Sequence, residues 1–335
     1  MAAEPFIESL LQRMTLSEKI GQLNLLSAGE GPDTGSPHSR DIRGRLEAGT
    51  LGAIFGVKSV RSVRAWQEIA VRRSRLGIPL LFAEDVIHGH RTVFPLPIAL
   101  ASSWDMDLIR ATARVAAREA SAEGINQVYA PMVDVARDAR WGRIAESPGE
   151  DPFLAARYAE AMVRGLQGDD LRAEDTVIAC LKHFVAYGAA AGGRDYDNAS
   201  LAPDELIAIY AEPFRAGVAA GAGSVMAAFN AVNKRPMHAH RGLIDGWLRR
   251  HCGFEGVVVA DYTGVRELIA HGLGDRAAVA ALALMAGVDM DMIGEDYLAC
   301  LPDIAEHGLR RPESGLDVSA GEIAEAIDRS CRRVL

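Results

Sequence analysis

Short apolar runs alternate with helix-like stretches along the whole chain, and this alternation is the feature that most constrains the fold. The apolar runs are short, bounded by turn residues and mostly without polar interruption, as expected of strands buried on both faces. They cover Leu23–Leu26, Leu51–Val57, Ile78–Val86, Gln127–Val135, Val177–Val185, Ser224–Asn230, Gly256–Asp261 and Val288–Ile293.

Helical spacing predicts the segments that separate these strands. They cover Ile7–Met14, Ser17–Gln22, Asp41–Ala48, Val60–Leu76, Asp107–Glu123, Asp151–Leu166, Pro203–Ala220, Leu243–Cys252, Arg276–Ala286 and Ala320–Val334. A Gly/Pro/Ser-rich loop is expected at Ala28–Ser39. Strands that alternate with helices in this way predict an α/β fold, a (β/α)8 TIM-like barrel. An open doubly wound sheet is the alternative, but no Gly-rich phosphate fingerprint follows the first strands. Residues 1–335 contain no repeat or linker and are expected to form one domain.

Composition and charge exclude several classes of partner and site. Of 335 residues, 49% are hydrophobic, and the net charge of −9 comes without a basic stripe. Nucleic acid and membrane are therefore not expected as partners, and a neutral substrate is favoured. The longest apolar run, Ala277–Ala286, is too short to span a bilayer. The four dispersed cysteines suggest neither a zinc knuckle nor a disulfide framework. The N-terminal residues do not resemble a secretory signal, which predicts a cytoplasmic location, or a periplasmic one if a leader has been removed.

The stretch Gly256–Val265, GVVVADYTGV, carries the main candidate for chemistry. Three consecutive valines run directly into Asp261, at the carboxyl end of a predicted buried strand. A carboxylate at this place is costly to bury unless it is paired, hydrogen-bonded or used. In an α/β barrel the carboxyl ends of the strands carry the active site. Asp261 is therefore the candidate catalytic nucleophile.

Four other polar residues lie at or just past the ends of predicted strands, namely Asp85, Asp134, Lys182 and His183. The apolar residue Met226 has a similar position. In a barrel these positions converge on one rim. Carboxylates and cations around a wet pocket suit a sugar, because vicinal hydroxyls need both donors and acceptors at fixed spacing. A carboxylate nucleophile beside a second, protonated carboxyl fits retaining glycoside hydrolysis.

Five sequence blocks resemble one known family in the same order. They are PLLFAEDVIHGHRTVFP (Pro79–Pro95), YAPMVDVARDARWGRIAESPGEDPFL (Tyr129–Leu154), LKHFVAYGAAAGGRDY (Leu181–Tyr196), VMAAFNAVN (Val225–Asn233) and GFEGVVVADYTGVRELIAHG (Gly253–Gly272). The chain resembles the N-terminal barrel of glycoside hydrolase family 3 and, within it, the bacterial periplasmic β-glucosidases. The resemblance runs from Met14 to the last residue.

The resemblance implies a role for several residues. Asp261 matches the family's aspartate nucleophile, and Asp85 matches the carboxylate that grips the far hydroxyls of the non-reducing sugar. Basic residues of the same subsite match Arg143, Lys182 and His183, and Met226 matches a residue beside the nucleophile. Phe229 stands where many members have a tyrosine. A retaining exo-acting β-glycosidase is implied, with a β-glucosidase as the first expectation, a β-linked glycoside or oligosaccharide as substrate, and no cofactor or metal.

The acid/base residue is where the sequence departs from the family. Many members take it from a second, C-terminal α/β sandwich domain, whereas this chain ends where the linker to that domain would begin. Members that work with the barrel alone resemble β-N-acetylhexosaminidases and use a KHFPGHG…DSH loop, which here reads KHFVAYGAAAGGRDY. Glu267, six residues after Asp261, is the remaining candidate. Glu146 and Asp195 are weaker ones, expected to shape the pocket or to hold Arg143 and Arg194.

Two other readings stay open. A non-catalytic sugar-binding barrel, or one component of a split enzyme, would keep the gripping residues and lack a proton donor, which a homo-oligomer or a partner chain could supply. A metal-dependent barrel hydrolase would use residues such as His88, His90, His238 and His240, and would lose activity in EDTA.

Overall fold

The computed structural model describes residues 3–28, 41–57 and 59–335, so the loop expected at Ala28–Ser39 lies outside the described residues after Ala28. One parallel sheet has the strand order β10-β7-β5-β4-β3-β2-β1-β11, and a parallel bridge between Val259 and Met290 joins its end strands. The predicted (β/α)8 barrel is confirmed. Its strands are β1 (Asn24–Ser27), β2 (Ala53–Phe55), β3 (Leu81–Glu84), β4 (Gln127–Val128), β5 (Ile178–Phe184), β7 (Ser224–Ala227), β10 (Val257–Val259) and β11 (Asp291–Met292).

The helices begin where the sequence places capping residues. Thr15 and Glu18 form a capping box on α2, and Asp151 caps α7 with Pro152 in its first turn. The helices are α1 (Ala3–Arg13), α2 (Leu16–Gln22), α3 (Ile42–Glu47), α4 (Val60–Arg73), α5 (Pro97–Ala101), α6 (Met106–Ala122), α7 (Pro152–Gln167), α8 (Pro203–Glu205), α9 (Glu212–Ala219), α10 (Gly264–Glu267), α11 (Arg276–Ala286), α12 (Asp296–His307) and α13 (Ala320–Val334).

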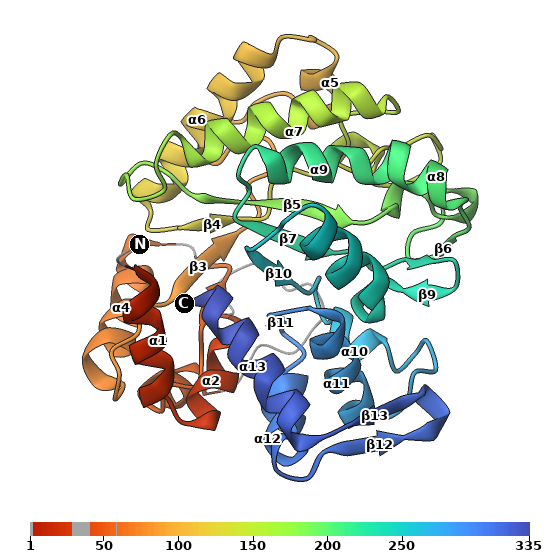
Figure 1. Ribbon diagram of the computed structural model, residues 1–335. Coiled ribbons are helices and arrows are strands. Elements are labelled where there is room, and N and C mark those ends of the chain that lie inside the picture. The colour runs from red at the N-terminus through yellow and green to blue at the C-terminus, as the bar shows by residue number, and fades with distance from the viewer. Residues whose placement is uncertain (1–2, 29–40, 58) are drawn as a thin grey trace. The chain divides into compact units, whose positions relative to one another are not determined.

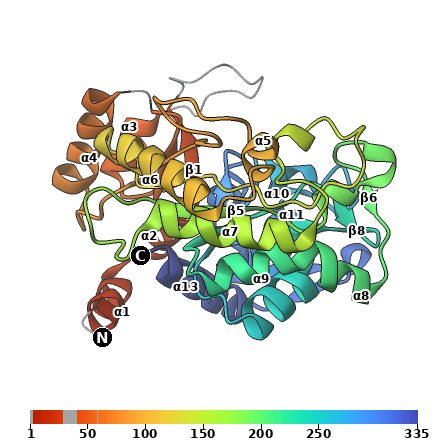
Figure 2. The ribbon, with the colours of Figure 1, turned by 90° about the horizontal axis from the view of Figure 1, so that it is seen from above.

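The chain divides into two compact units. The central unit comprises Ala83–Met237 and Asp245–Gly256, and the terminal unit comprises Met1–Phe82, His238–Ile244 and Val257–Leu335. In the central unit, α7 packs between α6 and α9, as Figures 1 and 2 show from two directions. The expectation of one domain over 1–335 stays a prediction.

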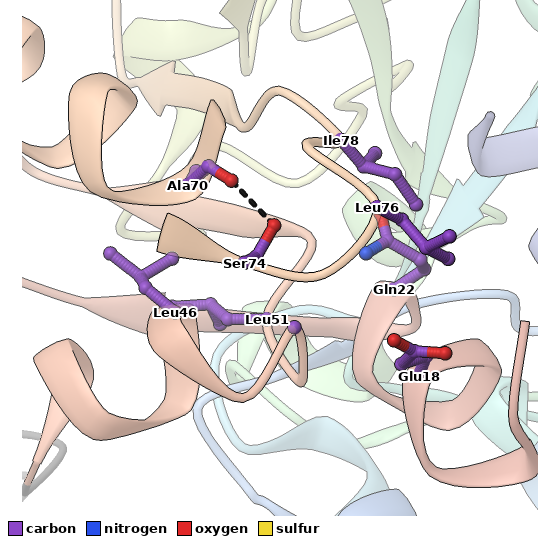
Figure 3. Close-up of a pocket in the computed structure, with 9 residues that line it drawn as sticks. Glu18, Gln22, Leu46, Leu51, Ala70, Ser74, Leu76 and Ile78 are labelled. Atoms are coloured by element: carbon purple, nitrogen blue, oxygen red, sulfur yellow. Dashed lines mark hydrogen bonds between the residues drawn. The ribbon is translucent and has the colours of Figure 1, made fainter. Parts of the chain in front are cut away.

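In the terminal unit, an apolar core forms between the first strands and the helices α3 and α4. It is made of Leu26, Ile42, Leu46, Leu51, Ile54, Val57, Ile69, Ala70, Leu80 and Phe82. Near it lies a pocket lined by Glu18, Gln22 and Ser74 among apolar side chains (Figure 3). Its volume of about 10 Å³ is room for one water molecule and none for a sugar. It lies next to the amino ends of the strands, the side that serves stability in such barrels.

Some elements differ from the prediction for reasons that lie in single residues. β4 ends at Val128, well before the expected Val135, because Pro131 has no N–H to donate to a strand ladder. The expected helix Pro203–Ala220 is interrupted by a π-helical segment, Leu206–Ala211. Pro213 cannot bond the carbonyl four residues before it, which accounts for that interruption.

Other elements were not predicted at all. The segment Leu309–Arg311 (β12) pairs antiparallel with Leu316–Val318 (β13), directly after the unpredicted helix α12. A small three-stranded sheet is formed by β6 (Asn198–Ala199), β8 (Ala231–Val232) and β9 (Arg235–Pro236). The expected helix Leu243–Cys252 is present as a π-helical segment, Gly242–His251.

Two buried carboxyls face each other beside Gly294, at the end of β11. Asp291 Oδ2 accepts the backbone N–H groups of Asp296 and Tyr297, at 2.6 and 3.2 Å. Asp291 Oδ1 and Asp296 Oδ2 have no hydrogen-bond partner within the described part of the chain. A Cβ on Gly294 would lie 2.7 Å from each of them. Burial first, and then the charge of Asp296, raise the pKa of Asp291 to about 7.

We expect the stability of the protein to fall as the pH rises from about 4 to about 7. The folded state holds the proton of Asp291 more tightly than the unfolded state. The stabilisation from this proton is therefore complete at low pH and is lost as the pH rises through the pKa of Asp291 in the folded state. The shift corresponds to at most about 4 kcal/mol. Asp291→Asn should reduce this dependence, because an amide does not titrate in this pH range. Urea unfolding at pH 5 and pH 8 measures it. The exposed Asp317→Asn is the matched control, and equal pH dependence in wild type and Asp291→Asn would contradict the account.

Candidate functional site

An ion pair at the ends of two strands forms the first part of the candidate site. Lys182, in β5, places Nζ 2.7 Å from Oδ1 of Asp85, the residue that follows β3. The lysine side chain is 5% exposed and the aspartate side chain is 46% exposed. A buried cation therefore holds an open carboxylate, whose remaining lone pairs can accept hydrogen bonds from a ligand.

The next residue of β5, His183, makes a buried pair with Asp134. Its ring Nδ1 lies 2.8 Å from Asp134 Oδ2, and its backbone N–H donates to the same oxygen at 2.9 Å. Both side chains are buried. Burial raises the pKa of Asp134 and lowers the pKa of His183, so the imidazole is neutral and held in one orientation.

A second ion pair lies in the loop after β4. Glu146 accepts two hydrogen bonds from the guanidinium of Arg143, at 2.8 and 3.0 Å. The guanidinium carbon of Arg143 also lies 5.6 Å from the ring centre of Tyr187, over one face of that ring. The bidentate ion pair and the stacking together fix the orientation of the Arg143 guanidinium group.

The Gly-rich loop after β5 is tied to the same region. The indole N–H of Trp141 donates to Asp195 Oδ1 at 3.0 Å, and the rings of Trp141 and Tyr187 meet edge to face at 5.4 Å. Tyr187 also meets the ring of His183, at 5.2 Å. Met226 lies in β7 and is buried. The central unit thus brings together the expected residues Asp85, Arg143, Glu146, Lys182, His183 and Asp195, and it also contains Met226.

In the terminal unit, Asp261 lies just after β10, as the sequence predicted. The three valines before it are buried. The backbone N–H of Asp261 donates to His238 Nε2 at 3.0 Å, and its Oδ1 accepts the N–H of Tyr262 at 2.7 Å. Burial lowers the pKa of His238 to about 3, so its ring is neutral and Nε2 can accept. These contacts fix the backbone that carries the carboxylate.

Gly264 allows this arrangement of His238. A Cβ at position 264 would lie 2.3 Å from His238 Nε2, closer than any real contact. Only glycine therefore fits where the turn after Asp261 passes the imidazole.

Glu267 is the last residue of α10, a short helix that starts three residues after Asp261. Its side chain is half-buried. Burial first, and then the negative charge of Asp261, raise the pKa of Glu267 to about 7, while a hydrogen bond from Thr263 acts in the opposite direction. Asp261 is thus close enough for its charge to act on Glu267. Two carboxyls of the terminal unit are coupled in this way, and one of them holds its proton near neutral pH.

The sequence did not give a role to several residues that build this region. Asp134 is predicted only to lie at a strand end and His238 only to be a possible metal ligand, and Trp141, Tyr187 and Tyr196 are not among the predicted site residues. The sequence feature that could have identified these three aromatic residues is their position in two Gly- and Arg-rich loops. In the described ranges, no group of three or more His, Cys, Asp or Glu side chains is arranged to hold a metal ion. Within the same ranges, no helix combines the length and the apolar character that crossing a bilayer requires.

Comparisons with known proteins identify the family of the chain. Residues 15–335 match the model of the glycosyl hydrolase family 3 N terminal domain. The chain is 42% identical over 308 residues to a periplasmic beta-glucosidase of Salmonella typhimurium, covering 92% of this chain and 40% of that protein. It is 39% identical over 239 residues to a beta-xylosidase of Formosa agariphila, covering 67% of this chain and 33% of that protein.

A solved structure is similar over nearly the whole chain. The beta-glucosidase from Listeria innocua in complex with isofagomine superposes with a TM-score of 0.88 at 36% identity, covering 99% of this chain and 45% of that one. The chain therefore spans less than half the length of these relatives. The family match over 15–335, together with these similarities, shows that the chain belongs to glycosyl hydrolase family 3, in its N-terminal domain.

Proposed function

We propose that this chain acts as a retaining, exo-acting β-glycosidase and that its first substrate class is β-glucosides. The observation that carries the proposal is the place of Asp261 directly after β10, where His238 and the N–H of Tyr262 hold it, with Glu267 on the short helix that follows. Retaining hydrolysis needs a nucleophilic carboxylate and a second carboxyl that donates a proton, and the raised pKa of Glu267 suits the donor. A relative named beta-glucosidase supports this substrate class, and one named beta-xylosidase supports the broader class of β-glycosides.

In the proposed mechanism, a carboxylate oxygen of Asp261 attacks the anomeric carbon of the sugar. The bond from that carbon to the leaving oxygen breaks, and Glu267 gives its proton to this oxygen. Glu267 then takes a proton from a water molecule, whose oxygen attacks the same carbon and releases Asp261. The sugar leaves with its original anomeric configuration, because it has been inverted twice.

Binding of the non-reducing sugar is assigned to the central unit. Asp85, held by buried Lys182, accepts hydrogen bonds from hydroxyl groups of the sugar. Arg143 and His183 contribute to the same subsite, each fixed by its carboxylate partner. Glu146 and Asp195 support this subsite by holding Arg143 and Trp141, and Met226 supplies a buried apolar surface. No step of this mechanism requires a cofactor.

We expect Asp85→Ala to lower kcat/KM for a β-glucoside by roughly 10- to 100-fold, mainly through a higher KM. The charged acceptor is lost in the ground state and in the transition state alike, and such hydrogen bonds contribute about 1.5–3 kcal/mol. Steady-state kinetics measures the effect. Asp170→Ala removes an aspartate that also pairs with an arginine, but in an exposed loop, and serves as control.

Asp85→Ala also leaves the ammonium of Lys182 buried, so unfolding must be measured on the same samples. A change in kcat with unchanged KM would contradict the binding role, provided that the variant is folded.

A second reading has support in the loop KHFVAYGAAAGGRDY, which lacks the KHFPGHG…DSH pattern of barrels that carry their own acid/base pair. In this reading the chain binds the sugar and carries the nucleophile, and another chain or segment supplies the proton donor. β-Glucosyl fluoride separates the two, since its leaving group needs little acid assistance. Turnover of the fluoride without turnover of a β-linked disaccharide would favour the second reading. The cellular location and any partner chain stay predictions.

A further inference from the structure

An aromatic cluster extends from the buried His183–Asp134 pair to the surface of the central unit. Tyr187 meets His183 on one side and Trp141 on another. Tyr187 also meets the rings of Phe229 and Tyr196, at 6.3 and 6.4 Å. The rings of Tyr196 and Phe229 are 4.6 Å apart. Trp141, Tyr187 and Phe229 are buried, whereas Tyr196 is 48% exposed. The cluster therefore presents one large aromatic side chain to solvent.

The backbone of Tyr196 is in an uncommon conformation. Its φ is +66°, in the left-handed region that bulky side chains rarely adopt. The neighbouring residues hold it there. Asp195 accepts the indole N–H of the buried Trp141, and the Tyr196 ring packs against Phe229. A strained backbone that is held at a candidate site points to a use for the side chain that it directs.

The position of the ring relative to the sugar-gripping residues suggests that use. Arg143 covers one face of Tyr187, so that ring does not serve as a stacking surface. Tyr196 is one residue from Asp195 and is connected through Tyr187 to His183 and Arg143, which are assigned to the first sugar. A β-linked glucose unit has equatorial substituents and two C–H faces, which pack well on the negative face of an aromatic ring.

We propose that Tyr196, backed by Phe229, forms the platform for the second sugar of the substrate, the one on the leaving-group side. This inference rests on the proposed function and adds a residue that sets preference for the leaving group. Tyr196 then favours a substrate whose leaving group is itself a pyranose over one with a small leaving group. Its effect is on binding, and the chemical step at the anomeric carbon does not depend on it.

The test is direct binding of two sugars, measured by isothermal titration calorimetry on the full chain carrying Asp261→Asn, so that laminaribiose is not hydrolysed during the titration. Each variant named below is compared in that background. Glucose fills the first subsite alone, and laminaribiose, a β-linked disaccharide, fills both. We expect Tyr196→Ala to weaken laminaribiose binding roughly tenfold and to leave glucose binding within about twofold. Tyr196→Phe keeps the ring and should bind both sugars as the wild type does. The control is Val93→Ala, which shortens an exposed side chain of the same unit that is not aromatic.

Unchanged laminaribiose binding in Tyr196→Ala would overturn the proposal, and so would a parallel loss of both sugars. Hydrolysis of β-glucosyl fluoride is measured on the Tyr196 variants with Asp261 intact, because the leaving group of this substrate is a single atom that cannot use the platform. If the wild type hydrolyses the fluoride and Tyr196→Ala binds laminaribiose normally, the platform alone is wrong. If the wild type neither hydrolyses the fluoride nor binds either sugar, the proposed function fails, and the platform with it.

Discussion

We expect Asp261→Asn to fold normally and to lose hydrolysis of β-glucosyl fluoride by about 10⁴-fold or more, as is usual when a nucleophile is removed. The neutral amide cannot displace fluoride from the anomeric carbon. The contacts that fix this position are kept, because His238 accepts from the backbone N–H and an amide oxygen can accept from Tyr262. kcat/KM and the urea midpoint, measured on the same preparation, test both parts of the expectation.

The matched control for Asp261→Asn is Asp275→Asn, in the same unit. Asp275 caps α11 and pairs with Arg311, so this change removes one carboxylate charge away from the proposed chemistry. It should reduce stability slightly and leave fluoride hydrolysis within about twofold. Hydrolysis by Asp261→Asn at more than about one-tenth of the wild-type rate would exclude Asp261 as the nucleophile.

The second large effect is expected from Glu267→Gln, and its size depends on the substrate. A poor leaving group needs a proton, so hydrolysis of laminaribiose should fall by about 10²- to 10⁴-fold. β-Glucosyl fluoride needs little acid help, so its kcat/KM, which reports formation of the glycosyl-enzyme, should stay within about tenfold of the wild-type value. The two rates, measured side by side, separate loss of the donor from loss of the site as a whole.

The pH dependence of the wild type follows from the same residue. Glu267 acts in its protonated form, and its pKa is raised to about 7 by burial and by the charge of Asp261. Laminaribiose hydrolysis should therefore be highest below pH 7 and fall about tenfold for each pH unit above it, whereas fluoride hydrolysis should not follow this limb. Glu295→Gln, which loses a carboxylate paired with Arg45, is the control. Equal losses for both substrates, or no loss at all, would place the proton donor elsewhere.

Much of the fold could be predicted because it depends on local patterns. The unbroken valines of β10 and the capped amphipathic helix α13 appear where the sequence placed them. Errors arose where a single backbone group decides the outcome, as at Pro131, three residues after β4, and at Pro213, in the first turn of α9. Residues 294–319 fold into α12 and a hairpin through contacts with other segments, which local periodicity does not show.

The candidate site could be predicted only in part, for a similar reason. Charged residues at strand ends are visible in the sequence, and they led to Asp85, Lys182 and Asp261. The partners that orient them come from distant segments, as Asp134 does for His183. The proton affinity of Glu267 depends on burial, which no spacing rule gives. The sequence could therefore identify Glu267 as a candidate acid/base residue but could not predict its raised pKa.

The most direct test of the account is to trap the intermediate with 2-deoxy-2-fluoro-β-glucosyl fluoride and to analyse the intact protein and its peptides by mass spectrometry. The reagent forms the glycosyl-enzyme quickly and releases it slowly, and it needs little acid help in forming it. The account predicts one fluoroglucosyl group per chain, attached to Asp261. A label on any other residue, or no label on folded protein that binds glucose, would contradict it.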